Sequence, residues 1–344
     1  MPDPRDVNQT DYPVDGIFSH KAQFLLNYAV LAPSSHNTQP WQFEVSDNSI
    51  MLFADTGRAM PVSDSFNREL IISCGAALGN FEIAASFFGL SCRYEYFPDE
   101  RQENLLANIY FDSGHTVTAD DRRLFSAIKD RTTNRSEFRA YSIPSSVSAY
   151  LEKEAKKAGI ELKLIADEAQ RCTFAELITN ADRTHFANPE FREELSKWIR
   201  ANNSGQTDGI TSSSTWTPDI VAKIESMIIK KFDVGSSVAA KDRDLIEHSA
   251  ALVVFATESE EPSQWLRTGK FLSQLLLYFA AIGVAVDYLN QAVEIVDIRK
   301  LLRNQAGVSG YPQLVLRIGK ADTTKPTARR PLEDVVTAHT VTSQ

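Results

Sequence analysis

Two long segments of this chain are apolar on nearly every side of a predicted helix, and glycines frame both at the same spacing. One pair is Gly75 and Gly89, the other Gly269 and Gly283, and each pair is 14 positions apart (89 − 75 and 283 − 269). Each segment then runs directly into a predicted strand. A helix that is apolar all round needs cover on all sides. The two helices are therefore predicted to cover each other along a pseudo-twofold axis, the alternative being two unrelated Ala/Leu-rich helices that share a glycine spacing by chance.

Apolar periodicity predicts mixed helices and strands in the rest of the chain, which indicates an α+β fold. Asp64 is the expected N-cap of the first long helix, and the stretch 202–217, rich in Asn, Ser, Thr and Gly, is the expected mobile loop. The expected helices are 20–31, about 64–88, a short one after 120, 145–157, 168–183, 189–200 and 262–282, and the expected strands are 41–45, 50–54, 94–97, 105–111, 161–165, 252–256 and 313–318.

The net charge, the cysteines and the lengths of the apolar stretches limit which partners and which location are expected. There are 36 Lys and Arg residues against 45 Asp and Glu, a formal charge of −9, which argues against nonspecific binding to nucleic acid or to an anionic membrane. The three cysteines form no C-x-x-C pair, so neither a disulfide scaffold nor a zinc site is indicated. The polar residues 1–15 lack the apolar core of a secretion signal, and the mostly apolar stretch 271–286 is shorter than the ~20 residues that span a bilayer. A cytoplasmic protein is expected.

Two short polar segments stand out once the common signatures are excluded. The chain has no G-x-S-x-G, G-x-G-x-x-G, G-x-x-x-x-G-K-[ST] or H-E-x-x-H run, which argues against the common hydrolase, kinase and zincin families. The first segment, 32–41, reads A-P-S-S-H-N-T-Q-P-W and follows a predicted helix. Its polar groups, held between two prolines, would suit a flat heterocycle. An ordinary loop that ends a helix would have a similar composition.

The second segment places Arg131, Thr133 and Arg135 at alternate positions. In an extended backbone these side chains project from one side, where they could close on a phosphate. A solvated loop between helices is the alternative, and it is the usual place for such charges.

Both segments resemble motifs of the flavin-dependent nitroreductase superfamily. The run 32–41 resembles its A-P-S-S-x-N-x-Q-P-W motif, and 131–135 resembles its R-x-[ST]-x-[RK] phosphate motif. The run 319–336, with Arg329 and Arg330, is similar to the basic C-terminal motif of the family. The histidine after the paired serines, together with the chain length, resembles the Acg-like branch, in which one chain imitates a dimer. The likeness covers roughly residues 18–337.

The resemblance implies an α+β nitroreductase-like fold in which two tandem repeats form an intramolecular pseudo-dimer around the long central helices. The first repeat would be 18–115 and the second 120–337, packed as one compact unit. Between positions aligned by the family spacing, the first repeat spans 42 residues (75 − 33) and the second 110 (269 − 159). The second repeat thus carries an insertion, placed at about 185–250, that is expected to act as a lid or a wall beside the flavin.

The resemblance also implies a single composite FMN site. Family members carry the arginine motif about 28 residues before the proline of the other motif. Counting back from Pro33 reaches Arg5, next to the acidic Asp6, and counting forward from Arg131 reaches Gly159, where the Ser/Asn loop is missing. The first repeat therefore retains the ring-contacting loop, and the second retains the phosphate-binding arginines.

Residue by residue, the resemblance assigns the phosphate and ribityl chain to Arg131, Thr133 and Arg135 with Arg329 or Arg330. It assigns the isoalloxazine ring to the loop after Ala32, and flavin N5 to the strand that follows the second central helix. The residues expected at the ring are Pro33, Ser34, Ser35, His36, Asn37 and Gln39 from the loop, and Asn290 and Gln291 from the strand.

The implied function is hydride transfer from NADH or NADPH to FMN and onward to a small acceptor such as a nitroaromatic or a quinone. No catalytic side chain is obligatory, and His36 would either supply a proton or only pack against the ring. A flavin-sequestering protein, in which the lid blocks turnover, is the main alternative, and a degenerate scaffold without a cofactor is a third. The internal duplication favours a monomer.

Overall fold

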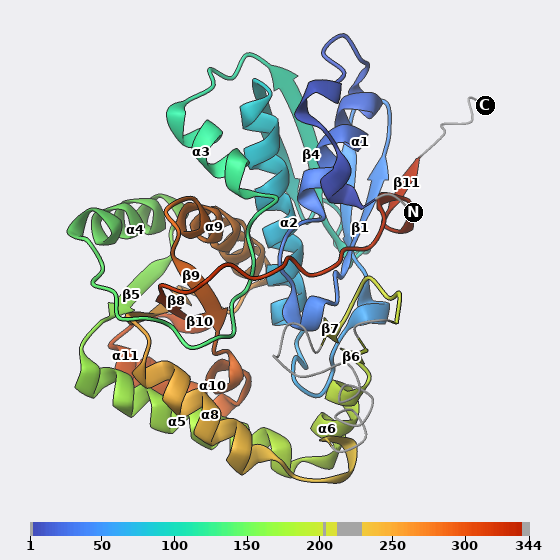
Figure 1. Ribbon diagram of the computed structural model, residues 1–344. Helices are drawn as coiled ribbons and strands as arrows, with labels where there is room; N and C mark the ends of the chain where they lie inside the picture. Colours follow the sequence, from blue (N-terminus) through green and yellow to red (C-terminus); the bar gives the residue numbers. More distant parts are fainter. Residues whose placement is uncertain (1–2, 202–203, 212–228, 339–344) are drawn as a thin grey trace.

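The computed structural model describes residues 3–201, 204–211 and 229–338 (Figure 1). Two halves, each with one main β-sheet and its covering helices, lie on either side of a central pair of helices (Figure 1). This arrangement agrees with the predicted α+β fold. The first sheet has the strand order β11-β1-β2-β4-β3, and the second has the order β5-β8-β10-β9. The strands of the first sheet are β1 (Trp41–Val45), β2 (Ile50–Ala54), β3 (Leu90–Tyr96), β4 (Leu105–Ser113) and β11 (Val336–Ala338). The strands of the second are β5 (Glu161–Ile165), β8 (Ala251–Thr257), β9 (Ala285–Tyr288) and β10 (Tyr311–Gly319).

The helices surround the two sheets, and most of them match the predicted ranges. They are α1 (Phe18–Ala29), α2 (Arg68–Phe87), α3 (Ala119–Ala127), α4 (Ser145–Ala158), α5 (Glu168–Ala187), α6 (Pro189–Ser196), α8 (Gly235–Glu247), α9 (Pro262–Ala281), α10 (Gln291–Glu294) and α11 (Val296–Ala306). The last two, and α8, were not predicted. In α11 the buried residues Ile298, Leu302 and Ala306 recur every four positions, a helical signal available in the sequence.

Several predicted boundaries were wrong, among them the end of α5, which extends to Ala187 and not to 183. Helix α6 ends at Ser196, and Ile199–Arg200 forms the short strand β6, because its backbone pairs with β7 (Ile210–Thr211). The range 94–97 was too short at one end and one residue too long at the other: strand β3 begins at Leu90, directly after the helix as the glycine-framed pattern predicts, and it ends before Phe97, whose left-handed φ of 49° breaks the strand. Asn67 holds the N-cap position of α2, not Asp64. The Asp64 carboxylate nonetheless accepts a hydrogen bond from the backbone N–H of Leu70 at 2.9 Å, so it satisfies one of the free donors of the first turn.

Helices α2 and α9 cross in direct backbone contact at the centre of the molecule (Figure 1). A Cβ on Gly75 would lie 2.2 Å from the carbonyl oxygen of Leu266, and a Cβ on Gly269 would lie 2.0 Å from that of Ile72. The two contacts are reciprocal, because 266 − 72 and 269 − 75 are both 194. A local twofold axis through the crossing produces such a pair of contacts, and only glycine allows so close an approach.

The main hydrophobic core is continuous across this crossing. It joins the inner faces of both sheets through α2 and α9. A second, smaller core lies between the other face of the second sheet and helices α5, α8, α10 and α11, so β8 is buried along its whole length. Helix α2 is long and apolar enough to cross a membrane by length and composition, but most of it is buried inside the protein.

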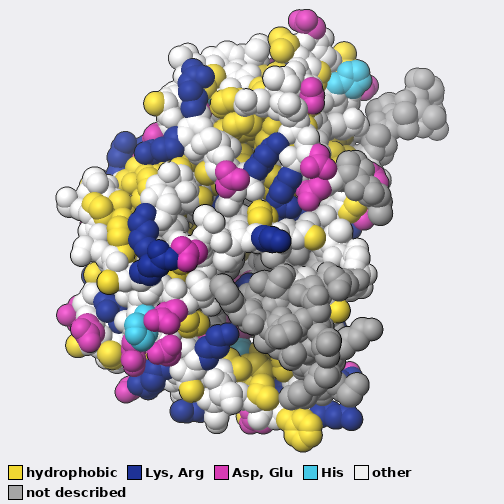
Figure 2. Space-filling view, in the orientation of Figure 1, with side chains coloured by type: hydrophobic (Ala, Val, Ile, Leu, Met, Phe, Trp, Pro, Cys, Tyr) yellow, Lys and Arg dark blue, Asp and Glu magenta, His cyan; other side chains and the backbone are white. Residues whose placement is uncertain are grey.

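The C-terminal segment crosses from the second half back to the first (Figure 1). After β10 the chain returns to the first sheet, where β11 pairs in parallel with β1, with Phe43 opposite Val336. The segment 320–335 therefore lies between the halves, where it brings Thr327 and Arg329 to a cavity. On the face shown in Figure 2, basic and acidic side chains are interspersed over the described part of the surface.

The glycine crossing can be tested by adding single methyl groups. We expect Gly75→Ala or Gly269→Ala to lower the free energy of unfolding by ~2 kcal/mol or more, because overpacking a tight contact outweighs the better helix propensity of alanine. Urea denaturation measures the change. Gly57→Ala is the matched control, since its Cβ would meet only the flexible Asp55 carboxylate. Wild-type stability in both crossing variants would contradict the assigned role.

Candidate functional site

The polar loop after α1 has an unusual backbone. His36, Asn37 and Gln39 have left-handed φ angles of 50°, 55° and 52°, a conformation that is costly for residues other than glycine and that clusters at functional sites. The loop is pinned to itself by Ser34, whose Oγ accepts from the backbone N–H of Gln39 at 2.9 Å. It is pinned to α2 by Ser35, whose Oγ donates to the Glu69 carboxylate at 2.8 Å. The predicted rigid loop is therefore present, and α2 holds it.

The predicted arginine segment lies across the edge of β9. Asn134 anchors it, because its backbone N–H donates to the Val286 carbonyl at 2.9 Å and its side-chain amide donates to the Asp322 carbonyl at 2.8 Å. Arg131, Thr133 and Arg135 then line the same cavity, as their alternate spacing predicts.

The loop and the arginine segment, about a hundred residues apart in the sequence, meet at two adjoining cavities. The smaller has a volume of about 40 Å³ and the larger about 310 Å³. Predicted site residues line one or both: Pro33, Ser34, Ser35, His36, Asn37, Arg131, Thr133, Arg135, Asn290, Gln291 and Arg329. The structure therefore brings together groups from both halves of the chain.

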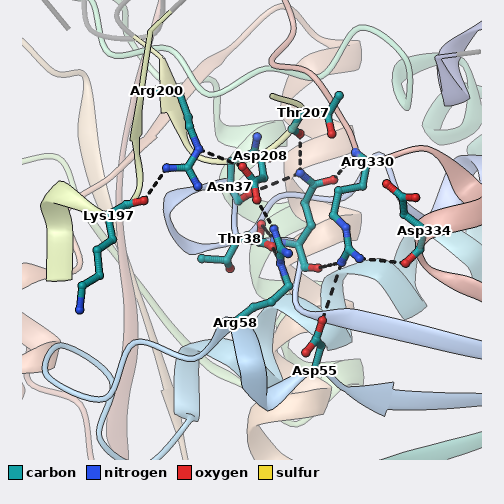
Figure 3. Close-up of polar contacts among 12 residues, drawn as sticks. Asn37, Thr38, Asp55, Arg58, Lys197, Arg200, Thr207, Asp208, Arg330 and Asp334 are labelled. Carbon is teal, nitrogen blue, oxygen red and sulfur yellow. Dashed lines mark hydrogen bonds and ion pairs between the residues drawn. The ribbon is translucent and has the colours of Figure 1, made fainter. Parts of the chain in front are cut away.

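Two predicted site residues, Gln39 and Arg330, do not line either cavity. Gln39 is buried, and its amide donates to the Thr207 carbonyl at 2.8 Å and accepts from the backbone N–H of Arg330 at 2.8 Å. The Arg330 guanidinium donates to the Gln39 and Asp334 carbonyls (Figure 3). Both residues therefore hold the loop in place by hydrogen bonds without lining either cavity.

Part of the predicted insertion is fastened to this loop through Asp208 (Figure 3). Its carboxylate pairs with Arg58 and accepts from Arg200 at 3.0 Å. The backbone N–H of Gly209 donates to the Asn37 carbonyl at 3.3 Å. We call these contacts the Asp208 clasp. Within the predicted mobile loop 202–217, residues 204–211 are thus tied down, and 202–203 and 212–217 lie outside the described residues.

The smaller cavity is strongly electropositive. Arg131 is buried, and its Nε and Nη1 have no hydrogen-bond partner among the described residues. Burial lowers the pKa of Arg131 and, together with the nearby charges of Arg131 and Arg5, also lowers that of Arg329. An arginine in a protein stays protonated, and a buried charge without a partner is costly. The cavity therefore suits an anion such as a phosphate group.

Arg5 and Tyr288 were not among the predicted site residues. The Arg5 guanidinium donates to the Thr327 carbonyl at 2.7 Å and lies close enough to Arg131 and Arg329 to lower their pKa values. Its position 28 residues before Pro33 was the available signal. Tyr288 lines the larger cavity, and burial raises the pKa of its phenol. Within the described residues, no cluster of His, Cys, Asp and Glu could hold a metal ion.

His36 lines both cavities, and its Nδ1 is buried without a partner among the described residues. Burial, and then the positive charge of Arg135, lowers its pKa from 6.5 to about 4. The imidazole is therefore neutral at physiological pH. As the pH falls from 6.5 towards 4, the unfolded chain binds a proton here that the folded protein does not, so stability is lost in that window.

We expect His36→Gln to flatten the acid side of the stability profile. Between pH 7 and pH 5 the wild-type protein should lose roughly 2 kcal/mol more stability than the variant. Thermal unfolding at several pH values measures this difference. His20→Gln, an exposed position on α1, is the control and should follow the wild type. Parallel profiles for wild type and His36→Gln would contradict the neutral, buried imidazole.

Comparison with known proteins places the chain among named relatives. It is 30% identical over 319 residues to a Mycobacterium tuberculosis protein provisionally named NAD(P)H nitroreductase Rv3131, covering 91% of this chain and 90% of that one. It is 29% identical over 317 residues to the M. tuberculosis protein Acg, which carries the same provisional activity, with 89% and 92% coverage. Serratia PigM is 23% identical over 341 residues, with 94% and 95% coverage.

No family model matches the chain. Among solved structures, the FMN-dependent nitroreductase NfnB of Mycobacterium smegmatis, in complex with NADPH, aligns with a TM-score of 0.41 and 15% identity over 62% of this chain and 96% of NfnB. The similarity to Rv3131 extends over nine-tenths of both chains. The chain therefore belongs to the NAD(P)H nitroreductase family that includes Acg.

Proposed function

We propose that the protein is an FMN-dependent NAD(P)H oxidoreductase that passes electrons to a small acceptor such as a nitroaromatic or a quinone. The observation that carries the proposal is the buried guanidinium of Arg131, which has no partner among the described residues and faces a cavity shared with the polar loop. Membership of the NAD(P)H nitroreductase family supports the oxidoreductase. The resemblance of 32–41 and 131–135 to the flavin-binding motifs supports FMN as the cofactor.

The two ends of the site fit the two ends of FMN. In the smaller cavity, Arg131, Thr133, Arg135 and Arg329 would hold the phosphate, because a dianion would satisfy the Arg131 guanidinium, whose Nε and Nη1 have no partner among the described residues. The larger cavity would hold the isoalloxazine ring against the loop. The proposed ring contacts are Pro33, Ser34, Ser35 and Asn37 from the loop, and Asn290 and Gln291 from the segment after β9.

When bound, the flavin supplies the hydride chemistry, and the protein residues bind, orient and exclude water. His36 is neutral and lines both cavities, and its Nδ1 has no partner among the described residues, so it would orient a ligand or hold a proton. Asn290 is oriented by the backbone N–H of Val315, which donates to its Oδ1 at 3.2 Å. Gln39 and Arg330 would act only by positioning the loop.

We also propose that the chain is a monomeric pseudo-dimer, with repeats at about 18–115 and 120–337 and an insertion at about 185–250. The reciprocal contacts of Gly75 and Gly269 support this proposal. A cytoplasmic location is proposed from the three free cysteines.

Removing the arginines should abolish cofactor binding. We expect Arg131→Ala combined with Arg135→Ala to weaken FMN binding at least roughly a hundredfold, since each charge-assisted hydrogen bond contributes ~1.5–3 kcal/mol. Flavin fluorescence titration of the FMN-free protein measures the affinity. Arg139→Ala is the matched control, because this neighbouring guanidinium is exposed and pairs with Asp322.

The single variant Arg131→Met separates binding from folding. It keeps the bulk of the side chain and removes an unpaired buried charge, so the FMN-free protein should melt no lower than the wild type. The melting temperature should then fail to rise on addition of FMN. Full FMN occupancy in the double variant would contradict the assignment of Arg131 and Arg135 to the FMN phosphate.

The Asp208 clasp favours a second candidate, a protein that holds FMN with little turnover. The clasp fixes the segment 204–211 against the loop through Asn37, Thr38 and Gln39, next to the cavities. If this segment blocked the pyridine nucleotide, flavin would be bound but not reduced.

Anaerobic NADPH distinguishes the two candidates. We expect the flavin absorption of the wild type to bleach and to return when a quinone is added. Asp208→Asn, which weakens the clasp, should change the bleaching rate by roughly two- to tenfold, since one hydrogen bond contributes about 0.5–1.5 kcal/mol. The control variant Asp47→Asn, at an exposed turn, should bleach at the wild-type rate. Absorption that persists in the wild type but bleaches in Asp208→Asn would indicate sequestration, and a protein that cannot bind FMN would indicate a degenerate scaffold.

A further inference from the structure

The larger cavity is acidic on the side formed by α5, α8 and α10. Asp182 of α5, Asp242 of α8 and Glu294 of α10 all line it. Gln291 donates a hydrogen bond of 2.7 Å to Asp242, so the residues of α8 and α10 lie in contact. This acidic wall belongs to the same cavity as His36 and Arg135, which places it beside the proposed flavin site.

Asp182 is unusual within this wall. Its side chain is only 1% exposed, and its Oδ2 has no hydrogen-bond partner among the described residues. Burying a carboxylate without a partner costs several kcal/mol, and native proteins satisfy nearly all buried polar groups. An unpartnered, buried oxygen at a cavity wall therefore points to a ligand with a hydrogen-bond donor.

The charges around the cavity do not balance within the protein. Two other carboxylates of the lining are neutralised, Glu69 by Arg68 at 2.8 Å and Asp287 by Arg317 at 2.9 Å. Arg135 lies 3.9 Å from the already paired Asp287, and the remaining base, Lys241, is exposed.

His185 lies 3.5 Å from Glu294 but does not neutralise it. Burial lowers the pKa of this histidine to about 4, so the imidazole is uncharged at neutral pH. Among the described residues, no ion pair therefore joins Asp182, Asp242 or Glu294 to a charged base of the cavity lining, although the charges of Arg317 and Lys241 lower the pKa of Asp242.

The remaining walls are apolar and partly aromatic. Phe186, Phe191 and Leu195 line the same cavity as the three carboxyl groups. Apolar walls with a few converging polar groups are typical of small-molecule sites, and an aromatic face also attracts a cation. The cavity thus combines a surface for an apolar body with acceptors for a positively charged end.

We propose that this cavity binds electron acceptors that carry a protonated amine, with the ammonium group held by Asp182, Asp242 and Glu294. The inference rests on the proposed function, because it names the class of acceptor for that site. An ammonium group supplies three donors and one positive charge, which satisfies the free oxygen of Asp182 and relieves the repulsion among the carboxyl groups.

The pKa values of the three carboxyl groups are raised by burial and by the nearby carboxylates, and a bound ammonium group would lower them again. Burial, and then the charge of Asp242, raises the pKa of Asp182 to about 7. Burial, and then the charge of Asp287, raises that of Asp242 to about 6. Burial also raises the pKa of Glu294, with Glu69 as the next cause. The wall is thus poorly solvated and short of positive charge.

The test compares 4-nitrobenzylamine, which is cationic, with 4-nitrobenzyl alcohol, which is neutral, as acceptors for the flavin-loaded protein. We expect the wild type to prefer the amine in kcat/KM, with the difference in KM. In Asp182→Asn and in Asp242→Asn the preference should fall by about tenfold, the loss expected for one charge-assisted hydrogen bond. Asp244→Asn, an exposed residue on α8 outside the cavity lining, is the control and should keep the wild-type preference.

A binding measurement without turnover separates this inference from the proposed function. Benzylamine should raise the melting temperature of the wild type more than benzyl alcohol does, and Asp182→Asn should remove that difference. Asp182→Asn should itself melt no lower than the wild type, because it removes a buried unpaired charge. If the protein binds no flavin but benzylamine still raises its melting temperature, the proposed oxidoreductase function is refuted, whereas the proposed cation site is supported.

Equal values of kcat/KM for the amine and the alcohol in the wild type would overturn the inference. An unchanged amine preference in both aspartate variants would also overturn it. A lower melting temperature in Asp182→Asn together with an unchanged preference would identify Asp182 as a structural residue only.

Discussion

The backbones of α2 and α9 touch at Gly75 and Gly269, and the rest of the chain is arranged around this contact. Because no side chain separates the helices there, the two sheets share one hydrophobic core. The same helices also form part of the larger cavity, to which α2 contributes Glu69 and Ser73 and α9 contributes Leu272. A shift of α2 against α9 at the crossing would therefore move these residues relative to the rest of the cavity lining, since packed interiors transmit displacement.

The site is built by segments that are distant in sequence and held from behind. Glu69 and Ser34 fix the strained loop, Asn134 fixes the arginine segment, and Gln39 and Arg330 join the loop to the returning C-terminal segment. Such supporting hydrogen bonds keep binding groups in a defined geometry before a ligand arrives. The left-handed backbone of the loop persists because these contacts determine its shape.

Unbalanced charge is the second theme of the site. Among the described residues, Nε and Nη1 of Arg131 in the small cavity and Oδ2 of Asp182 in the larger one have no hydrogen-bond partner. The two groups form no ion pair, and they line different cavities. Buried charges without partners lower stability, and proteins retain such features where function requires them. The polarity of the site thus matches a ligand set that is anionic at one end and cationic at the other.

Much of the fold and the site followed from the sequence alone. Periodicity located α2, α9 and most strands, because an apolar face repeats locally with the period of its own element. The resemblance of 32–41 and 131–135 to family motifs identified most of the lining of the smaller cavity, including Pro33 and Arg131, but only a minority of the lining of the larger one. Amphipathic α11 had a usable signal that was missed.

Only the tertiary structure decided which polar residues face the cavities and which support them. Gln39 and Arg330 carry the same motif signal as their neighbours, yet their partners come from Thr207 and Asp334, and long-range partners leave no local pattern. Arg5 and Asp182 gained their roles in the same way, from charges brought near by folding. The sequence by itself determined the helices, the strands and the presence of two binding segments, because these depend on neighbouring residues. Burial and pairing depend on the whole packed chain, so the charge pattern of the site was decided by the fold.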